Sequence, residues 1–228
     1  MHYARIPRAY WQARLRMAKA MGLNTIATYV FWNFHETKPG HFDFSTGEHG
    51  LGAFLKLAQE EGLWVVLRPG PYACAEWEFG GYPSYLGRDS TLVVRSRDPR
   101  FLAAEKRYVQ ALAKVVRPYL VTHGGPVLMA QVENEYGSYG ADAAYLATTK
   151  KMFVEAGFDV PLFTADGDWL FGKGAIPGLL PAANGETNYD TLVARVNRAH
   201  RGRGPYFVAE FYPGWLDHWG EKFVRTPM

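Results

Sequence analysis

The chain has 228 residues, of which 48% are hydrophobic, so it is long enough to bury a substantial core. Its net charge of +3 arises from acidic and basic residues that are interleaved along the chain, which gives little support to a nucleic-acid-binding protein. A single cysteine, Cys74, excludes an intrachain disulfide, and no apolar run approaches the roughly 20 residues that a membrane-spanning helix needs. These values favour a globular protein.

The first part of the chain predicts strands that alternate with helices. The helix after Pro7 carries apolar residues at helical spacing and ends at Gly22, a residue type that commonly terminates helices. In chain order we expect a strand over residues 1–6, a helix over 7–22, a strand over 25–31, a helix over 51–62 and a short buried strand over 64–67.

The alternation continues to the end of the chain. The pair Asp98-Pro99 is typical of a helix start, because an aspartate side chain caps free N–H groups and proline tolerates the first helical position. In chain order we expect a helix from there to residue 119, a strand over 127–132, a helix over 141–156, strands over 162–164 and 180–184, a helix through Leu192, Val196 and Ala199, and a strand over 206–211.

Strands that alternate with helices indicate a parallel sheet covered by helices, either a barrel or a doubly wound sheet. No strand is followed by G-x-G-x-x-G or by a phosphate-binding G-x-x-x-x-G-K-[ST] loop, and polar clusters follow several strands instead, which favours a (β/α)8 barrel. Seven strands are predicted, and such barrels typically take about 250 residues. We therefore expect residues 1–228 to be one (β/α)8 barrel truncated at both ends, with the eighth strand and its preceding helix after Met228.

Two carboxylate-rich segments lie at predicted strand ends. The segment QVENEYG follows the strand over 127–132, and Glu210 of AEFYPGWLDHWG ends the strand over 206–211. In a barrel these two strands lie across the mouth from each other. Aromatic residues make up 15% of the chain and share short segments with polar residues, as suits a sugar-binding cleft. Two opposed carboxylates in such a cleft meet the demands of glycoside hydrolysis, which requires no metal or organic cofactor.

The spacing alone leaves the choice of acid open. If the strand continued through QVENEYG, Glu133 and Glu135 would point to the same face, and Asn134 to the opposite face. A metal-site interpretation has weak support, because the histidines that invite it form no recognisable ligand set; they are His35, His123 and His218.

Long, ordered stretches of the chain resemble the catalytic barrel of the β-galactosidases of glycoside hydrolase family 35, and the resemblance runs from end to end. They are HYARIPRAYW, GLNTIATYVFWNFHE, LRPGPYACAEWEFGG, GGPVLMAQVENEYGSYG and AEFYPGWLDHWG. The resemblance implies that Glu135 is the general acid/base and that Glu210 is the nucleophile of a retaining double displacement. It also implies that Asn134 binds the sugar 2-hydroxyl.

The same resemblance implies a pocket for a terminal galactose. Its expected wall and hydroxyl-binding residues are Tyr29, Cys74, Ala75, Glu76 and Tyr212, with Trp215 as an aromatic contact beside the nucleophile. Taken without the resemblance, Tyr29 is equally a core aromatic and Cys74 a small buried residue.

The function implied by the resemblance is a retaining, exo-acting β-galactosidase that removes terminal non-reducing β-D-galactose from oligosaccharides or glycoconjugates. An exo-β-glucosaminidase of related type and a carbohydrate-binding protein without turnover are the alternatives. The expected partner is a β-galactoside substrate, with no nucleic acid, no metal and no membrane span. The sequence does not determine linkage preference, oligomeric state or compartment. The resemblance further implies β-rich domains after the barrel.

Overall fold

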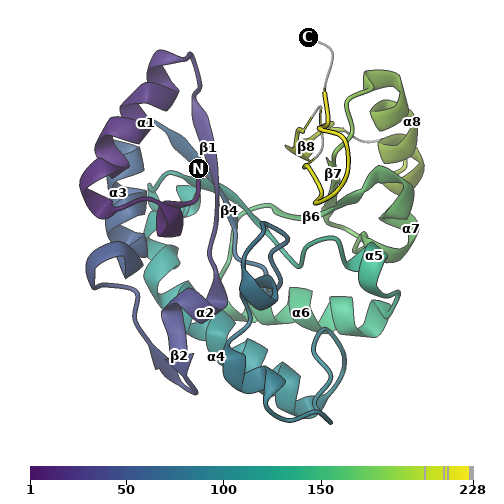
Figure 1. Cartoon of the computed structure of the whole chain (residues 1–228), viewed down its shortest axis with the longest axis horizontal. Coiled ribbons are helices and arrows are strands. Elements are labelled where there is room, and N and C mark those ends of the chain that lie inside the picture. Colours follow the sequence, from purple (N-terminus) through teal and green to yellow (C-terminus); the bar gives the residue numbers. More distant parts are fainter. Residues whose placement is uncertain (203, 213, 215, 226–228) are drawn as a thin grey trace. The chain divides into compact units, whose positions relative to one another are not determined.

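The structure is a computed structural model that describes residues 1–202, 204–212, 214 and 216–225 (Figure 1). Its contacts divide the chain into two compact units. Unit 1 comprises Met1–Asn134 and Asp142–Phe163, and unit 2 comprises Glu135–Ala141 and Thr164–Met228.

Unit 1 is built on parallel strands. They are β1 (Thr25–Tyr29), β4 (Trp64–Arg68), β5 (Val127–Gln131) and the start of β6 (Leu162–Gly167). Strand β1 pairs with β4 over its whole length, β4 pairs with β5, and β5 pairs with the first residues of β6. The inner residues of β4 are apolar and buried, as is typical of a parallel sheet that is covered on both faces, whereas Leu128 and Met129 of β5 are apolar but only partly buried.

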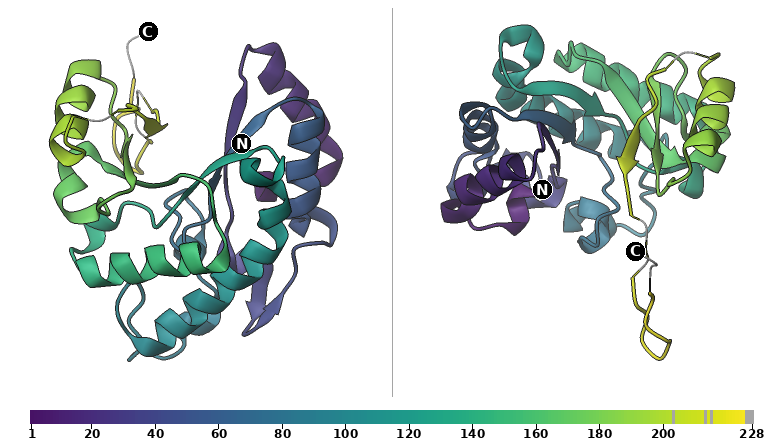
Figure 2. Two further views of the ribbon diagram at one scale, coloured as in Figure 1. Left: turned by 180° about the vertical axis from the view of Figure 1, so that it is seen from behind. Right: turned by 90° about the horizontal axis from the view of Figure 1, so that it is seen from above.

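The helices of unit 1 follow one another in space as they do in the chain: α1 contacts α3, α3 contacts α4, and α4 contacts α6 (Figures 1 and 2). Their bounds are Trp11–Ala20 for α1, Leu51–Glu60 for α3, Pro99–Val116 for α4 and Ala143–Ala156 for α6. The side chain of Asp98 caps α4 as predicted, and that of Asp142 caps α6. A short helix and an antiparallel hairpin complete the unit: α2 (Trp32–His35), β2 (Glu36–Lys38) and β3 (His41–Phe42).

Unit 2 contains the rest of β6 and two further parallel strands, β7 (Leu180–Asn184) and β8 (Val208–Glu210). The register of β7 and β8 places Asn184 opposite Glu210. The helices of this unit are α5 (Tyr136–Tyr139), α7 (Phe171–Gly174) and α8 (Tyr189–Ala199), and α8 packs against β7 (Figure 2). Single-turn 3-10 helices lie between elements in both units: Tyr3–Arg5, Arg8–Tyr10, Gly47–His49, Glu78–Gly81, Ser84–Gly87, Arg117–Tyr119, Val121–His123 and Asp168–Leu170.

The predicted strand over residues 1–6 is wrong. Tyr3–Arg5 form a 3-10 turn instead. This turn is favoured because the Tyr3 ring then lies in the core, where it stacks on Phe54 and lies edge-on to Trp11. The terminal ammonium of Met1 still reaches the sheet and donates to the Ala27 carbonyl oxygen at 2.8 Å.

The remaining predicted strands form within a few residues of their expected bounds. Among the described residues, six strands form the parallel sheet, and apart from the β2–β3 hairpin neighbouring strands are consecutive in the chain. A doubly wound sheet would reverse its strand order at a switch point, and this sheet does not. The order therefore agrees with the predicted fold class, a (β/α)8 barrel that is incomplete in the described residues.

Candidate active site

The loop after β5 separates its two carboxylates by backbone conformation. Strand β5 ends at Gln131, so the alternation of a strand does not extend to Glu133 and Glu135. Both glutamates have left-handed φ angles, +62° and +49°, which are uncommon for residues other than glycine. The Glu133 N–H donates to the Gly70 carbonyl at 2.8 Å, and the Glu135 N–H donates to the Ala165 carbonyl at 2.7 Å. Each glutamate is thereby fixed to a different part of the chain.

Glu133 is buried in unit 1 and its carboxylate is occupied by donors. Arg95 binds it with two hydrogen bonds, from Nη2 at 2.7 Å and from Nε at 3.1 Å. The Tyr145 hydroxyl donates to Oε1 at 2.8 Å, and the Asn134 backbone N–H donates to Oε2 at 2.6 Å. A bidentate arginine pair of this kind is strong and directional. These contacts give Glu133 a structural role and disfavour it as the acid.

Arg95 extends this pairing to the backbone of the loop. Its Nη2 also donates to the Asn134 carbonyl at 2.6 Å, and its guanidinium lies 4.0 Å from the centre of the Tyr72 ring. Arg95 is buried and has a φ of +52°. Arg95 and Tyr145 could not be predicted from the sequence, because they come from a loop and a helix far from QVENEYG, and no motif links them to it.

The two polar atoms of the Asn134 side chain differ in their hydrogen bonding among the described residues. Its Oδ1 accepts from Gln131 Nε2 at 2.7 Å, from Arg68 Nη2 at 3.0 Å and from the Tyr29 hydroxyl at 3.1 Å. These three donors identify Oδ1 and thus orient the amide. Its Nδ2 is buried and has no hydrogen-bond partner among the described residues. Asn134 Nδ2 is therefore a preoriented donor that no described residue uses.

Tyr29 lies against this amide instead of at the surface. Its side chain is 2% exposed, and the guanidinium of Arg68 lies 4.1 Å from its ring centre. The structure confirms the interpretation of Tyr29 as a core aromatic, and it shows in addition that the Tyr29 hydroxyl donates to Asn134 Oδ1. Its direct contact with a sugar stays a prediction.

The turn of Cys74, Ala75 and Glu76 is held by its backbone. The guanidinium of Arg5 donates to the Ala75 carbonyl and, at 2.9 Å, to the Glu76 carbonyl. Ala75 is buried, whereas Cys74 and Glu76 are exposed, so the interpretation of Cys74 as a small buried residue is wrong. The backbone carbonyls therefore anchor a turn whose Cys74 and Glu76 residues are exposed.

Unit 2 contains the two carboxylates predicted to be catalytic. Glu135 is partly exposed, and its Oε1 accepts from Asn184 Nδ2 at 3.1 Å. Glu210, also partly exposed, is the last residue of β8 and is the register partner of Asn184. Asn184 is therefore linked to Glu135 by a side-chain hydrogen bond and to Glu210 by strand pairing. The strand over 180–184 was predicted, but nothing in the sequence indicated a role for Asn184.

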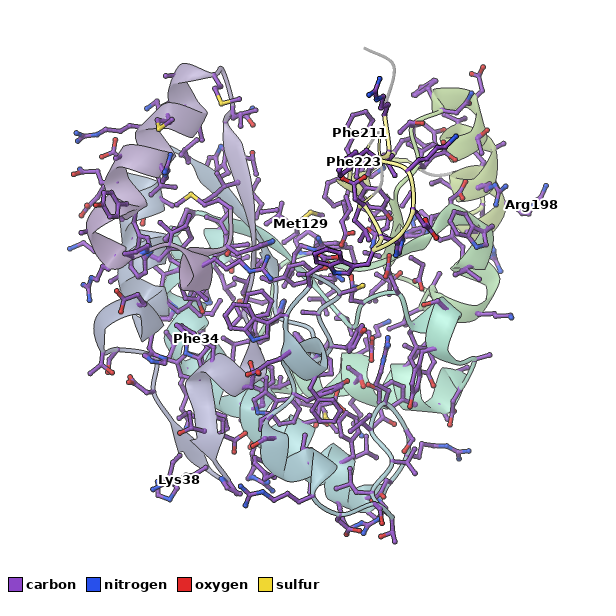
Figure 3. All side chains as sticks on the ribbon, in the orientation of Figure 1. Phe34, Lys38, Met129, Arg198, Phe211 and Phe223 are labelled. Carbon is purple, nitrogen blue, oxygen red and sulfur yellow. The ribbon has the colours of Figure 1, made fainter. Side chains whose placement is uncertain are left out.

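Tyr212 lies two residues beyond Glu210 and close to the end of β7. A Cβ atom at Gly185 would lie 2.7 Å from the Tyr212 hydroxyl oxygen, so the aromatic side chain approaches the backbone where only glycine leaves room. Between Glu210 and Tyr212, Phe211 is exposed (Figure 3). Trp215, the predicted aromatic contact beside the nucleophile, lies outside the described residues.

The histidines considered for a metal site lie in unrelated surroundings. His35 is buried between the Tyr3 hydroxyl and the Asp43 carbonyl, and burial lowers its pKa to about 4. His123 pairs with Asp159 near the surface. Within the described part of the chain, no group of three or more histidine, cysteine, aspartate or glutamate residues is arranged to hold a metal ion. No helix in that part is long and apolar enough to cross a membrane.

Comparison with known proteins places this site in a family. The model for glycosyl hydrolases family 35 matches residues 1–228. A protein named beta-galactosidase from Xanthomonas manihotis is 51% identical over 99% of this chain and 38% of its own length. One of the same name from Homo sapiens is 47% identical over 97% of this chain and 33% of its own length. The chain thus spans about a third of the length of these relatives.

Solved structures share the fold at low sequence identity. An exo-beta-1,4-mannosidase from an Opitutaceae bacterium matches with a TM-score of 0.64 at 15% identity, over 86% of this chain and 40% of the other. An endoglucanase from Thermotoga maritima matches with a TM-score of 0.53 at 11% identity, over 76% of this chain and 52% of the other. These two matches concern the fold alone and confirm the predicted class. With the family model matching its whole length, the chain belongs to the glycosyl hydrolases family 35.

Proposed function

We propose that the protein is a retaining, exo-acting β-galactosidase that removes terminal non-reducing β-D-galactose from oligosaccharides or glycoconjugates. Family membership and relatives named beta-galactosidase support the substrate class. The contrast within the ENE segment supports the assignment of the acid: Glu133 is occupied by Arg95 and Tyr145, whereas Glu135 is partly exposed beside the neutral side chain of Asn184. This contrast is the observation that carries the proposal.

The reaction proceeds in two displacements. In the first, Glu135 protonates the glycosidic oxygen while the Glu210 carboxylate attacks the anomeric carbon, which breaks the bond to the leaving group and forms a covalent galactosyl ester. In the second, Glu135 takes a proton from water, the water oxygen attacks the anomeric carbon, and Glu210 leaves as a carboxylate. The two inversions give net retention of the β configuration.

Asn134 binds the sugar beside the reacting carbon. Its Nδ2 is a buried donor with no partner among the described residues, and its orientation is fixed by the three donors to Oδ1. A sugar 2-hydroxyl oxygen supplies the acceptor that Nδ2 lacks, and such a bond strengthens as the oxocarbenium-like transition state forms. Tyr29 contributes by holding the amide.

The remaining pocket residues bind the outer hydroxyls and flank the ring. Glu76 is exposed on an anchored turn, and an ionised carboxylate makes strong hydrogen bonds to hydroxyl donors. Cys74 and Ala75 belong to the same turn, and Tyr212 contributes an aromatic wall beside the end of β7.

The test measures hydrolysis of nitrophenyl β-galactoside and of the corresponding β-glucosaminide by the intact protein that carries this chain. Glu135→Gln should lower kcat/KM on the galactoside by about 10²- to 10⁴-fold, the usual contribution of general acid–base catalysis. Glu210→Gln should abolish turnover, because an amide does not form the ester. Glu155→Gln is a matched control, because Glu155 lies on the exposed face of α6 and pairs only loosely with Lys151, at 3.6 Å.

Proton NMR of the sugar first released distinguishes the alternatives. Prompt β-galactose supports retention, and prompt α-galactose contradicts it. Cleavage of the glucosaminide in preference to the galactoside would identify an exo-β-glucosaminidase. Galactose binding without hydrolysis of either substrate would identify a carbohydrate-binding protein.

A further inference from the structure

Asn184 at the end of β7 is a buried amide that packing alone does not explain. Its side chain is fully buried, and its Nδ2 donates to Glu135 Oε1 at 3.1 Å. Its Oδ1 is buried too, and it has no hydrogen-bond partner among the described residues. A buried amide oxygen without a partner costs folding free energy, which a leucine of similar size would avoid. The hydrogen bond from Asn184 Nδ2 to Glu135 is the interaction that a leucine could not make.

That bond distinguishes the two oxygens of the Glu135 carboxyl group. An N–H directed at Oε1 favours a lone pair there and disfavours a proton, since two hydrogens would then face each other. When the group takes up its proton, Oε2 is therefore the favoured site. An acid that protonates a glycosidic oxygen must present its proton on the oxygen that faces the substrate. Fixing Oε1 leaves Oε2 as that oxygen.

The backbone around Glu135 does not fix the orientation of its carboxyl group, so a side chain is needed to fix it. The Glu135 N–H is fixed to the Ala165 carbonyl, and φ is +49°, so the main chain is set and the carboxyl group still has its own torsions. The residue after Asn184 also contacts the other carboxylate residue, because the Gly185 N–H donates to the Glu210 carbonyl at 2.8 Å. The end of β7 thus contacts both proposed catalytic residues.

We propose that Asn184 is a positioning residue that holds Glu135 through Oε1 in both protonation states and directs its proton to Oε2. Asn184 itself neither gains nor loses a proton: Oε2 gives its proton to the leaving oxygen in the first displacement and receives one from water in the second. This inference rests on the proposed function of Glu135.

The experiment compares two galactosides with different needs for an acid. Dinitrophenyl β-galactoside has a leaving group that departs with little protonation, whereas phenyl β-galactoside requires it. Asn184→Leu should lower kcat/KM for the phenyl substrate by about 10- to 100-fold, part of what an acid contributes, and change that for the dinitrophenyl substrate by less than about threefold. Circular dichroism and the unfolding midpoint report whether the variant folds.

Asn184→Asp supplies a second readout that does not depend on Asn184→Leu folding. At neutral pH the introduced carboxylate cannot donate to Oε1 and repels Glu135, so activity on the phenyl substrate should fall. At acidic pH the introduced group is protonated, and its hydroxyl can donate to Oε1, so the ratio of variant to wild-type activity should recover. Asn197→Asp is the matched control. Asn197 lies on α8, where its Oδ1 accepts from the Tyr206 hydroxyl at 3.0 Å. This control variant should show neither effect.

The outcomes separate this inference from the function on which it rests. Equal losses for both substrates, with no recovery at acidic pH, would show that Asn184 serves packing alone and would overturn the inference while leaving the proposed function intact. A wild type that hydrolyses neither galactoside would overturn both. Selective loss on the phenyl substrate together with acidic recovery of Asn184→Asp supports the positioning role.

Discussion

The surroundings of Glu133 in unit 1 differ from those of Glu135 in unit 2, although only Asn134 separates them in the chain. Glu133 is buried and receives hydrogen bonds from Arg95, from Tyr145 and from the Asn134 backbone. Glu135 is partly exposed, and the hydrogen bond to its carboxylate that we identify comes from the neutral amide of Asn184.

The difference indicates what each carboxylate can do. Burying a charge is expensive unless a counter-ion and hydrogen bonds compensate it, and Glu133 has both. A carboxylate so compensated is poorly suited to exchanging a proton with a substrate. The Glu135 carboxylate accepts its hydrogen bond from the neutral amide of Asn184 instead of from a cation. The backbone turn between them thus places two identical side chains in two different surroundings.

The largest expected effect comes from breaking the Glu133 pair. Arg95→Met leaves a buried carboxylate without its cation and should lower the free energy of unfolding by about 3–5 kcal/mol. Glu135→Gln should change it by less than about 1 kcal/mol, the range for a substitution that disturbs no buried network. Urea unfolding followed by tryptophan fluorescence measures both.

Arg97→Met is the control for Arg95→Met. Arg97 also pairs with an acid, Asp142 at 2.7 Å, but its side chain is 66% exposed. Exposed pairs are worth at most about 1 kcal/mol. Equal costs for the two arginine substitutions would contradict the structural role assigned to Glu133.

Glu105 in unit 1 is a third carboxyl group for comparison, and its pKa shows the effect of burial without a paired cation. Glu105 on α4 is fully buried, and burial, with a smaller contribution from the charge of Glu133, raises its pKa from 4.5 to about 8. The folded state therefore holds a proton that the unfolded chain releases above pH 4.5. Stability should fall as pH rises between these values, by about 1.4 kcal/mol for each pH unit.

Glu105→Gln tests this expectation, because the amide resembles the protonated acid and does not titrate. The wild type should lose about 1.4 kcal/mol relative to the variant between about pH 6 and pH 7 in urea unfolding. Parallel stability curves for the two proteins over this range would show that Glu105 is ionised in the folded state.

Much of the fold was predictable from local patterns. Apolar spacing located α3 and α4 closely, and the Asp98 cap marked the start of α4, because these helices bury a regular apolar face. The segment Met1–Ile6 was not predictable in this way. It was predicted to be extended, but packing of the Tyr3 ring on Phe54 and Trp11 favours the turn, and tertiary contacts of this kind are not visible in local sequence.

The candidate site was predictable only in its motif residues. The family resemblance pointed to Glu135 and Glu210, and their catalytic roles stay predictions. Spacing could not choose between Glu133 and Glu135, since the choice depends on two left-handed φ angles and on Arg95, which lies 38 residues before Glu133 in the chain. Asn184 was missed because a single amide at a strand end has no distinctive pattern.

The smallest expected effect comes from Tyr29, one of the three donors to Asn134 Oδ1. Tyr29→Phe keeps the packed ring and removes one of the three donors to Asn134 Oδ1, while Gln131 and Arg68 remain. The free energy of unfolding should fall by about 0.5–1.5 kcal/mol, the usual net value of one hydrogen bond. Because two donors still orient the amide, kcat/KM on a β-galactoside should fall by less than about tenfold. Tyr10→Phe, at a side chain that is 58% exposed, should change neither quantity. A loss of activity for Tyr29→Phe as large as that for Glu135→Gln would instead support the direct contact of Tyr29 with the sugar that the family resemblance implies.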